Sequence, residues 1–259
     1  MIELNIKVSG KGPSLVLIPG WAMSASVWGD WLDELEKHYQ VIRIDLPGQG
    51  ERVFEQAWTM DELVDVMAEK LPADCYVLGW SLGGMVGLAY ASKYASKVNG
   101  LIMLASSAKF VQSATWEHAQ QVGIMNTFSE GLLENPLATL KRFVMLQTQG
   151  LVSPRKISGI LKKSLCKVDI NQQAALACGL AVLQHADLRE QLAALRCPLL
   201  MLMGDKDQLI PAGVGLDSVK YNKHIDLHLI QGASHVPFLS HKDEVTERVL
   251  AFIQDKACA

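Results

Sequence analysis

The sequence has few cysteines and no excess of positive charge. Its five cysteines are odd in number, scattered and without Cys-x-x-Cys spacing. This pattern argues against a disulfide framework or a zinc site and favours a reducing compartment. The formal net charge of −3 excludes a globally basic nucleic-acid binder. A cytoplasmic protein that binds neither a metal nor nucleic acid is therefore expected.

Targeting segments, membrane spans and repeats are also missing. The N-terminal residues contain no basic stretch followed by an apolar one, so no signal peptide is expected. No apolar run reaches the length needed to span a membrane. Hydrophobic residues nonetheless make up 49% of the 259 residues. That is enough for one large α/β domain, or for such a core with an insertion.

Residues 75–91 predict a strand, a sharp turn and a helix. The stretch begins with apolar, aromatic and β-branched residues and reaches a Gly-x-Ser-x-Gly motif centred on Ser81. A serine at such a turn adopts a strained backbone, and side chains two positions to either side would collide with the flanking elements. The motif alone can occur by chance as a glycine-rich turn. The strand before it and the helix after it favour Ser81 as a nucleophile.

Strands and helices alternate along most of the chain. Besides the strand before Ser81, strands are expected over residues 2–8, 15–18, 41–45, 98–104, 198–203 and 226–230. Helices are expected over residues 26–38, 59–71, 214–220 and 242–255. This alternation predicts a mostly parallel sheet covered by helices on both faces. Residues 108–186 show only helical patterns, so we expect an α/β core from residues 1–107 and 187–259 with a helical lid inserted between them.

A catalytic serine needs a base within hydrogen-bond reach, and His235 is the best candidate among seven histidines. It follows the last apolar strand, which in a parallel sheet places it at the same edge as Ser81. The loop after the strand at 198–203 supplies two carboxylates. Asp207 is expected to orient the imidazole. Asp205 directly follows the strand-end glycine, and we expect it to tie down the turn instead.

Acyl transfer also needs donors for the negative charge that develops on the carbonyl oxygen. The backbone N–H of Leu82, at the start of the helix, is expected to be one. The backbone N–H of Trp21, in the loop after residues 15–18, is expected to be the other. Trp21 and Trp80 would then wall the acyl site, although both could also serve simple core packing.

These motifs resemble the α/β-hydrolase fold with a helical lid, in which the triad follows the order Ser, Asp, His. In detail they resemble the esterases of the biotin pathway that demethylate pimeloyl-[acyl-carrier protein] methyl ester. The matching segments are Pro19-Gly20-Trp21, Asp45-Leu46-Pro47-Gly48, Gly79-Trp80-Ser81-Leu82-Gly83-Gly84, Ala105-Ser106-Ser107, Arg142-Phe143-x-x-Leu146-Gln147-Thr148-x-Gly150, Ala186-Asp187-Leu188-Arg189 and His235-x-Pro237-Phe238. The triad motifs are shared with many esterases, lactonases and lipases, whereas the Arg-Phe-x-x-Leu-Gln-Thr segment is more specific.

By position, the resemblance implies a catalytic triad of Ser81, Asp207 and His235. It also implies substrate contacts by Trp21, Leu82, Phe143 and Gln147. No metal or organic cofactor is implied, and a monomer is expected. One departure is Pro19, because that family usually has His-Gly before the oxyanion loop. The change concerns local hydrogen bonding and leaves the triad complete.

The expected lid is basic. Residues 108–186 contain eight lysines and arginines and four acidic residues, a net charge of +4 that leaves −7 for the rest of the chain. Acyl-carrier proteins are strongly acidic, so such a surface would steer one towards the site. Arg142, Arg155 and Lys156 are the candidate carrier contacts. An ordinary solvated helical face would show a similar composition.

Three functions follow from these observations. The leading one, implied by the resemblance, is a serine carboxylesterase that hydrolyses the methyl ester of pimeloyl-[acyl-carrier protein]. The alternative is a general carboxylesterase or lactonase that acts on small free esters by the same mechanism. A non-catalytic binding module of the same fold is disfavoured, because all three triad members are present.

Overall fold

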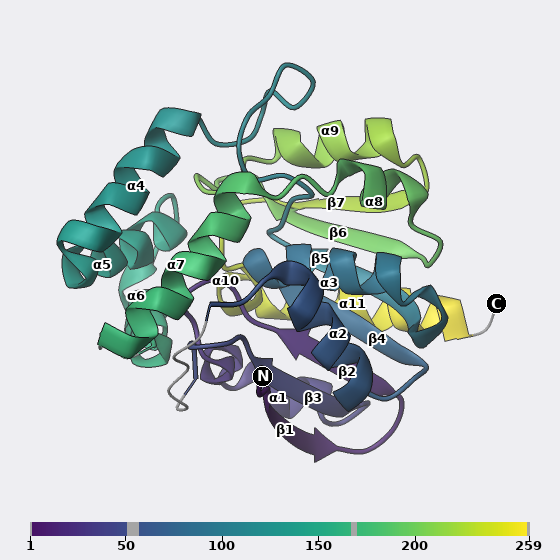
Figure 1. The fold of residues 1–259 in the computed structure, drawn as a ribbon. Helices are drawn as coiled ribbons and strands as arrows, with labels where there is room; N and C mark the ends of the chain where they lie inside the picture. The colour runs from purple at the N-terminus through teal and green to yellow at the C-terminus, as the bar shows by residue number, and fades with distance from the viewer. Residues whose placement is uncertain (1, 51–56, 167–169, 258–259) are drawn as a thin grey trace.

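In the computed structural model, strands and helices alternate as the sequence predicts (Figure 1). The structure describes residues 2–50, 57–166 and 170–257. Lys167 and Asp169, which enter the charge count of residues 108–186, and Cys258 lie outside the described residues. The strands are β1 (Asn5–Gly10), β2 (Ser14–Ile18), β3 (Gln40–Asp45), β4 (Cys75–Trp80), β5 (Val98–Leu104), β6 (Leu199–Gly204) and β7 (Ile225–Ile230).

These strands form one sheet in the order β1-β3-β2-β4-β5-β6-β7. All neighbouring pairs are parallel except β1 and β3, which are antiparallel. Residues 11–13 join β1 to β2, and this turn is too short for the crossover that parallel strands need. β1 therefore runs against the other strands. The α/β-hydrolase architecture predicted from the sequence is confirmed.

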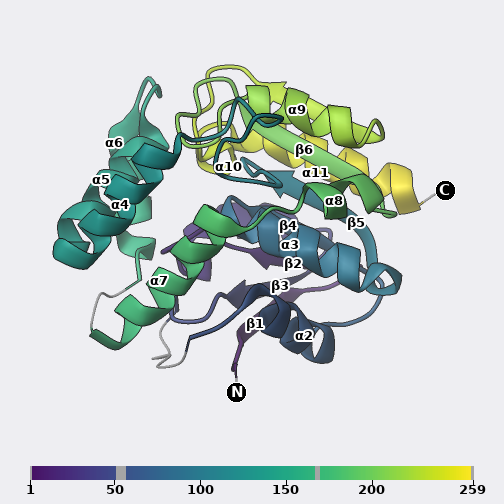
Figure 2. The same ribbon diagram turned by 45° about the horizontal axis from the view of Figure 1, so that its top comes forward.

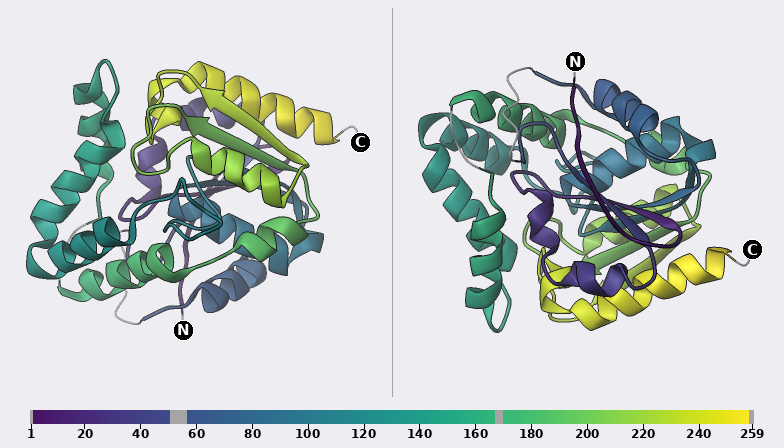
Figure 3. Two further views of the ribbon diagram at one scale, coloured as in Figure 1. Left: turned by 90° about the horizontal axis from the view of Figure 1, so that it is seen from above. Right: turned by 90° about the horizontal axis from the view of Figure 1, so that it is seen from below.

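Helices cover both faces of the sheet. The elements of the core are η1 (Ala25–Trp28), α1 (Trp31–Leu35), α2 (Met60–Lys70), α3 (Leu82–Lys93), η2 (Ala95–Lys97), α8 (Arg189–Ala194), α9 (Gly213–Tyr221), α10 (Pro237–Ser240) and α11 (Lys242–Ala257). Figure 3 shows α2 and α11 on opposite sides of the sheet. The predicted capping box at the start of α2 is confirmed by reciprocal hydrogen bonds between Thr59 and Glu62.

The helix expected over residues 26–38 is wrong in its continuity. Gly29 adopts a φ of 52°, which ends η1 and lets the chain restart as α1. The break brings Trp28 and Trp31 onto the same aromatic cluster, with ring centroids 4.9 and 5.7 Å from Phe238. Burial of these large rings stabilises the bent form over a straight helix.

Of the five helices that the structure describes between β5 and β6, the first four lie at one end of the molecule (Figures 1 and 2). We call them the helical insertion: α4 (Val122–Glu134), α5 (Pro136–Thr148), α6 (Pro154–Ser164) and α7 (Ile170–His185). α5 and α6 begin at prolines, because proline suits the first helical position. No helix in the described part of the chain is long and apolar enough to cross a membrane.

The junction of β4 and α3 is the tightest packed turn near the sheet edge. Ser81 has φ 56° and ψ −120°, and its N–H donates to the Leu104 carbonyl of β5 at 3.0 Å. A Cβ on Gly83 would overlap the carbonyl oxygens of Ile18 and Pro19. A Cβ on Gly79 would overlap the backbone of Gly83. Only glycine on either side lets α3 start this close to β2.

Gly83→Ala should lower the free energy of unfolding by about 1–3 kcal/mol, because backbone must move to admit the methyl group. Thermal unfolding followed by circular dichroism measures the loss. Gly159→Ala in α6 is the matched control, since a Cβ there meets nothing within 4 Å. The control should keep or slightly raise stability, by up to about 1 kcal/mol. Equal stability of the two variants would contradict the steric argument.

Candidate active site

Three loops at the carboxyl edge of the sheet bring Ser81, His235 and Asp207 into one hydrogen-bonded chain. Ser81 Oγ lies 2.9 Å from His235 Nε2, and His235 Nδ1 lies 2.8 Å from Asp207 Oδ2. The other carboxylate oxygen of Asp207 accepts the N–H groups of Leu209 and Ile210 at 2.8 and 3.0 Å. These bonds hold the carboxylate in one orientation. All three side chains are buried, and Ser81 retains 5% exposure.

Asp205 lies outside this chain. Its Oδ1 accepts the N–H of Gly232 at 2.6 Å, and its Oδ2 lies 3.1 Å from Lys206 Nζ. It therefore joins the loop after β6 to the loop after β7. This is the turn-bracing position that the sequence analysis expected for Asp205.

Trp80 contacts His235 through both a hydrogen bond and its ring. Its Nε1 donates to the His235 carbonyl at 2.8 Å, and its ring lies 5.6 Å from the imidazole. The rest of the indole packs on Trp28 and Phe238. These contacts agree with the core-packing role that the sequence analysis left open for Trp80, and a role as a wall of the acyl site stays a prediction.

The two expected oxyanion donors lie on adjacent segments. Leu82 is the first residue of α3, and Trp21 follows the end of β2 by three residues. Neither backbone N–H has a hydrogen-bond partner within the described ranges. Donors held rigidly and left unpaired are what a developing oxyanion requires.

The loop that carries Trp21 is held by residues to which the sequence analysis assigned no role. Asp45 Oδ1 accepts the N–H of Ala25 at 2.6 Å, and Gln49 Oε1 accepts the N–H of Met23 at 3.2 Å. Asp45 is the last residue of β3, and its position at the carboxyl edge of the sheet is the signal that could have identified it. These contacts fix the loop without the histidine that Pro19 replaces.

The helical insertion also holds this loop. Met23 forms an isolated antiparallel bridge with Leu165, directly after α6. Trp21 Nε1 donates to the Leu176 carbonyl of α7 at 2.9 Å. The expected oxyanion loop is therefore attached to both the core and the insertion.

A wholly apolar hollow lies between Trp21 and the insertion. Phe143 of α5 meets Trp21 edge to face with ring centroids 5.1 Å apart, and Phe128 of α4 lies 5.5 Å from Trp21. Leu180 and Leu209 complete much of the lining. The hollow measures about 40 Å³, room for about one water. Such walls suit a hydrocarbon chain.

Gln147 lies one turn after Phe143 on α5 and is fully buried. Both its amide nitrogen and its amide oxygen lack a hydrogen-bond partner within the described part of the chain. An unpaired buried amide costs free energy, so its presence needs a reason. A polar group of a bound substrate would supply that partner.

Arg142 lines a second hollow, of about 310 Å³, on the outer side of α4 and α5. This hollow and the apolar one share three lining residues, Ile124, Phe128 and Leu146. The exposed surface near Arg142 is therefore separated from Trp21 by only a few side chains.

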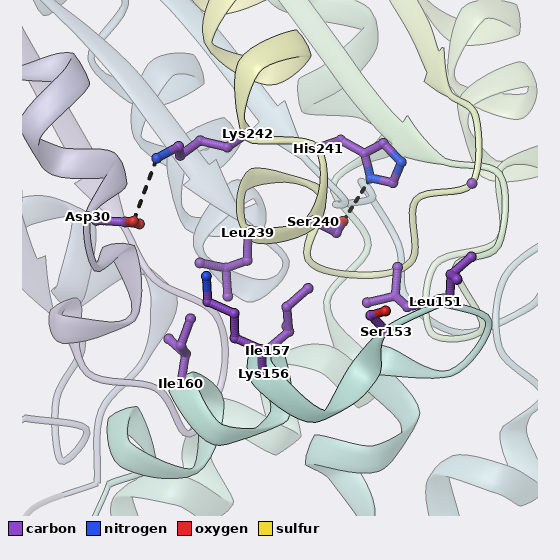
Figure 4. A pocket seen from close by; sticks show the side chains of 12 residues that line it. Asp30, Leu151, Ser153, Lys156, Ile157, Ile160, Leu239, Ser240, His241 and Lys242 are labelled. Atoms are coloured by element: carbon purple, nitrogen blue, oxygen red, sulfur yellow. Dashed lines mark hydrogen bonds and ion pairs between the residues drawn. The ribbon is translucent and has the colours of Figure 1, made fainter.

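Lys156 lies elsewhere. It lines a groove of about 470 Å³ between α6 and the segment that joins α10 to α11, together with Leu239 and Lys242 (Figure 4). Arg155 is exposed and lines neither this groove nor the hollow beside Arg142. The structure does not gather the three predicted carrier contacts into one hollow.

Two buried thiols and the hydroxyl of Ser106 are poorly suited to act as nucleophiles. Burial raises the pKa of the Cys166 thiol to about 12 and that of Cys75 to about 11, so both remain protonated at neutral pH. Ser106 Oγ donates to the Ser81 carbonyl at 2.6 Å and braces the turn. Among the residues that the structure describes, no group of three or more His, Cys, Asp or Glu is placed to hold a metal ion.

Comparisons with known proteins agree with this geometry. Residues 15–248 match the model of the alpha/beta hydrolase family. The pimeloyl-[acyl-carrier protein] methyl ester esterase of Xylella fastidiosa strain M23 is 36% identical over 253 residues, 96% of this chain and 98% of that protein. The one of Methylococcus capsulatus is 33% identical over 250 residues, again 96% and 98%. The resemblance stated from the motifs is confirmed.

Among solved structures, an esterase from Exiguobacterium antarcticum superimposes with a TM-score of 0.86. It covers 97% of this chain and 95% of its own, at 20% sequence identity. At that identity the likeness concerns the fold. The family match and the full-length relatives together show that this chain belongs to the alpha/beta hydrolase family.

Proposed function

We propose that the protein is a serine carboxylesterase of biotin synthesis that hydrolyses the methyl ester of pimeloyl-[acyl-carrier protein]. The observation that carries the proposal is the buried Ser81–His235–Asp207 chain beside an apolar hollow lined by Trp21 and Phe143. The full-length relatives that bear this esterase name support the choice of substrate.

In the first half-reaction, Ser81 Oγ attacks the ester carbonyl and its proton passes to His235 Nε2. Asp207 stabilises the imidazolium through Nδ1 and keeps the ring in the required tautomer. The carbonyl oxygen becomes an oxyanion and takes hydrogen bonds from the N–H groups of Trp21 and Leu82. When the tetrahedral intermediate collapses, His235 gives its proton to the methoxy group and methanol leaves.

In the second half-reaction, water attacks the acyl-enzyme. His235 accepts a proton from the water and returns it to Ser81 Oγ as the ester bond to the serine breaks. The product is the carrier-linked chain with a free terminal carboxylate. Because Ser81 is only 5% exposed and its surroundings are apolar, bulk water has restricted access to this chemistry.

The substrate chain is proposed to lie along α5. Its methyl ester reaches Ser81, its methylene groups contact Trp21 and Phe143, and Gln147 pairs with a polar group of the chain. A hollow of about 40 Å³ is smaller than a medium acyl chain, so α4 and α5 must separate for binding. In this proposal the helical insertion acts as a lid over residues of the core.

The carrier protein is proposed to dock near Arg142, because the hollow beside this residue adjoins the apolar one. Arg155 and Lys156 extend the positive surface along α6. A monomeric, cytoplasmic enzyme remains part of the proposal. The free thiols of Cys75, Cys166, Cys178 and Cys197 support a reducing compartment.

Ser81→Ala should lower kcat by about 10⁴-fold or more with folding intact, because no other group can form the acyl-enzyme. Hydrolysis of a carrier-linked methyl ester and of a free ester measures the loss. A fluorophosphonate probe should label Ser81 in the wild type, with the site read by mass spectrometry. Labelling at Ser106 or Ser107 instead would refute the assignment.

Asp207→Asn should lower kcat by about 10³- to 10⁴-fold, because the amide would favour the wrong imidazole tautomer. Asp205→Asn is the matched control on the same loop. It should cost far less activity, because Asp205 contacts Gly232 and Lys206 rather than His235. Steady-state kinetics on one free ester compares the two. The reverse ranking would make Asp205 the orienting carboxylate.

Arg142→Glu should lower kcat/KM for the carrier-linked ester about three- to tenfold at low salt, and leave a small free ester nearly unchanged. The physical reason is that only the carrier-linked ester uses the outer surface. Added salt should shrink the difference, since screening acts over about 8–10 Å. Equal loss on both substrates would mean damage to α5.

Arg155→Glu and Lys156→Glu, combined, test the rest of the basic surface. They should add a further loss on the carrier-linked ester that is smaller than that of Arg142→Glu, because neither lines the hollow next to the acyl site. No loss in any of these variants would favour a hydrolase of small free esters.

A further inference from the structure

The end of α5 is joined to the loop of His235 by one buried hydroxyl. Ser234 is fully buried, and its Oγ lies 3.0 Å from the Gln147 carbonyl and 2.8 Å from the Gln149 carbonyl. The partners are more than eighty residues apart in the chain. The hydroxyl has one proton, so it donates to this pair of oxygens as a bifurcated bond or alternates between them.

The two acceptors are carbonyls that a helix cannot satisfy by itself. α5 ends at Thr148, and the last four carbonyls of a helix have no intrahelical donor. At this end of α5, Gly150 follows the C-cap residue Gln149 with a φ of 92°, and the N–H of Leu151 donates to the Thr148 carbonyl at 3.2 Å. For the Gln147 and Gln149 carbonyls the donor comes from the core: it is the hydroxyl of Ser234, the residue before His235.

The loop of His235 is also attached to other segments of the core, at Gly232 through Asp205 and at two further positions. Lys206 N–H donates to the Ala233 carbonyl at 2.9 Å, and Trp80 Nε1 donates to the His235 carbonyl at 2.8 Å. The residues on both sides of Ser234, Ala233 and His235, therefore already have their carbonyls hydrogen-bonded to the core. Its side chain is what links this fixed loop to α5.

α5 also carries the side chains that face the substrate in the proposed function. Phe143 packs on Trp21, and Gln147 contributes both its unpaired amide and one of the carbonyls that Ser234 reaches. A shift of the end of α5 along its axis would therefore move Gln147 relative to His235. The Ser234 hydroxyl opposes that shift.

We propose that Ser234 is a positioning residue that locks α5 to the His235 loop, so that the imidazole stays aligned between Ser81 and Asp207 while the helical insertion moves. The inference rests on the proposed function for the role of His235. Loss of the Ser234 hydroxyl should therefore lower kcat, because the alignment of His235 changes. KM should stay nearly the same, because the groups that contact the substrate are unchanged.

Ser234→Ala should lower kcat about three- to tenfold on a short p-nitrophenyl ester, with KM nearly unchanged; this is the effect of one lost hydrogen bond. The rate of Ser81 labelling by a fluorophosphonate should fall by the same factor. Ser234→Cys leaves no cavity, since the thiol is slightly larger than the hydroxyl, but a thiol is a weak donor. It should remain slow, which separates loss of the donor from loss of packing.

Ser218→Ala is the matched control. Ser218 is also fully buried, and its hydroxyl donates to the Val214 carbonyl within α9 at 2.8 Å. Thermal unfolding should show similar losses for both alanine variants, whereas Ser218→Ala should keep the wild-type kcat. The proposal is overturned if Ser234→Ala keeps wild-type kcat, if the loss is the same in Ser218→Ala, or if Ser234→Cys restores activity.

The short ester needs no carrier protein, so the test is separate from the substrate proposal. A wild-type enzyme that hydrolyses the short ester but not the carrier-linked one would count against the proposed substrate. The comparison of Ser234→Ala with Ser218→Ala would still decide the role of Ser234.

Discussion

The backbone of Ser81 is the constraint on which the site depends. Its positive φ turns the chain from β4 into α3 within one residue, and this conformation is held by the Leu104 carbonyl and by close packing at Gly83. A non-glycine residue in this region costs free energy, which the surrounding packing must offset. The turn points the hydroxyl at His235, and the N–H of Leu82 at the start of the helix has no hydrogen-bond partner among the described residues.

The helical insertion contributes to the same site from outside the core. It contacts the loop after β2 at Met23 and Trp21, and it contacts the His235 loop through Ser234. These contacts are hydrogen bonds to backbone groups, so they depend on the position of whole helices rather than on single side chains. A partner that moves α5 or α6 would act on the reacting groups through the same contacts.

The sequence analysis missed or left open features that depend on contacts between segments far apart in the chain. A continuous helix was expected over residues 26–38, but burial of Trp28 and Trp31 around Phe238 favours the break at Gly29. For Trp80, both a wall of the acyl site and core packing were left open, and its indole donates to the His235 carbonyl and packs on Phe238. Periodicity describes neighbours along one element, and both outcomes depend on elements far apart in the chain.

The sequence by itself determined the fold class, the order of strands and helices in the core, and the residues that meet as Ser81, Asp207 and His235. The local sequence pattern is sufficient to predict these features, because the loops at the carboxyl ends of parallel strands all lie at one edge of the sheet. Only the tertiary structure decided how the site is held. Gln49 and Ser234 accept from or donate to backbone groups of other segments, and such partners have no signature in spacing or composition. Their roles follow from packing, which brings each buried donor to an acceptor that would otherwise be unpaired.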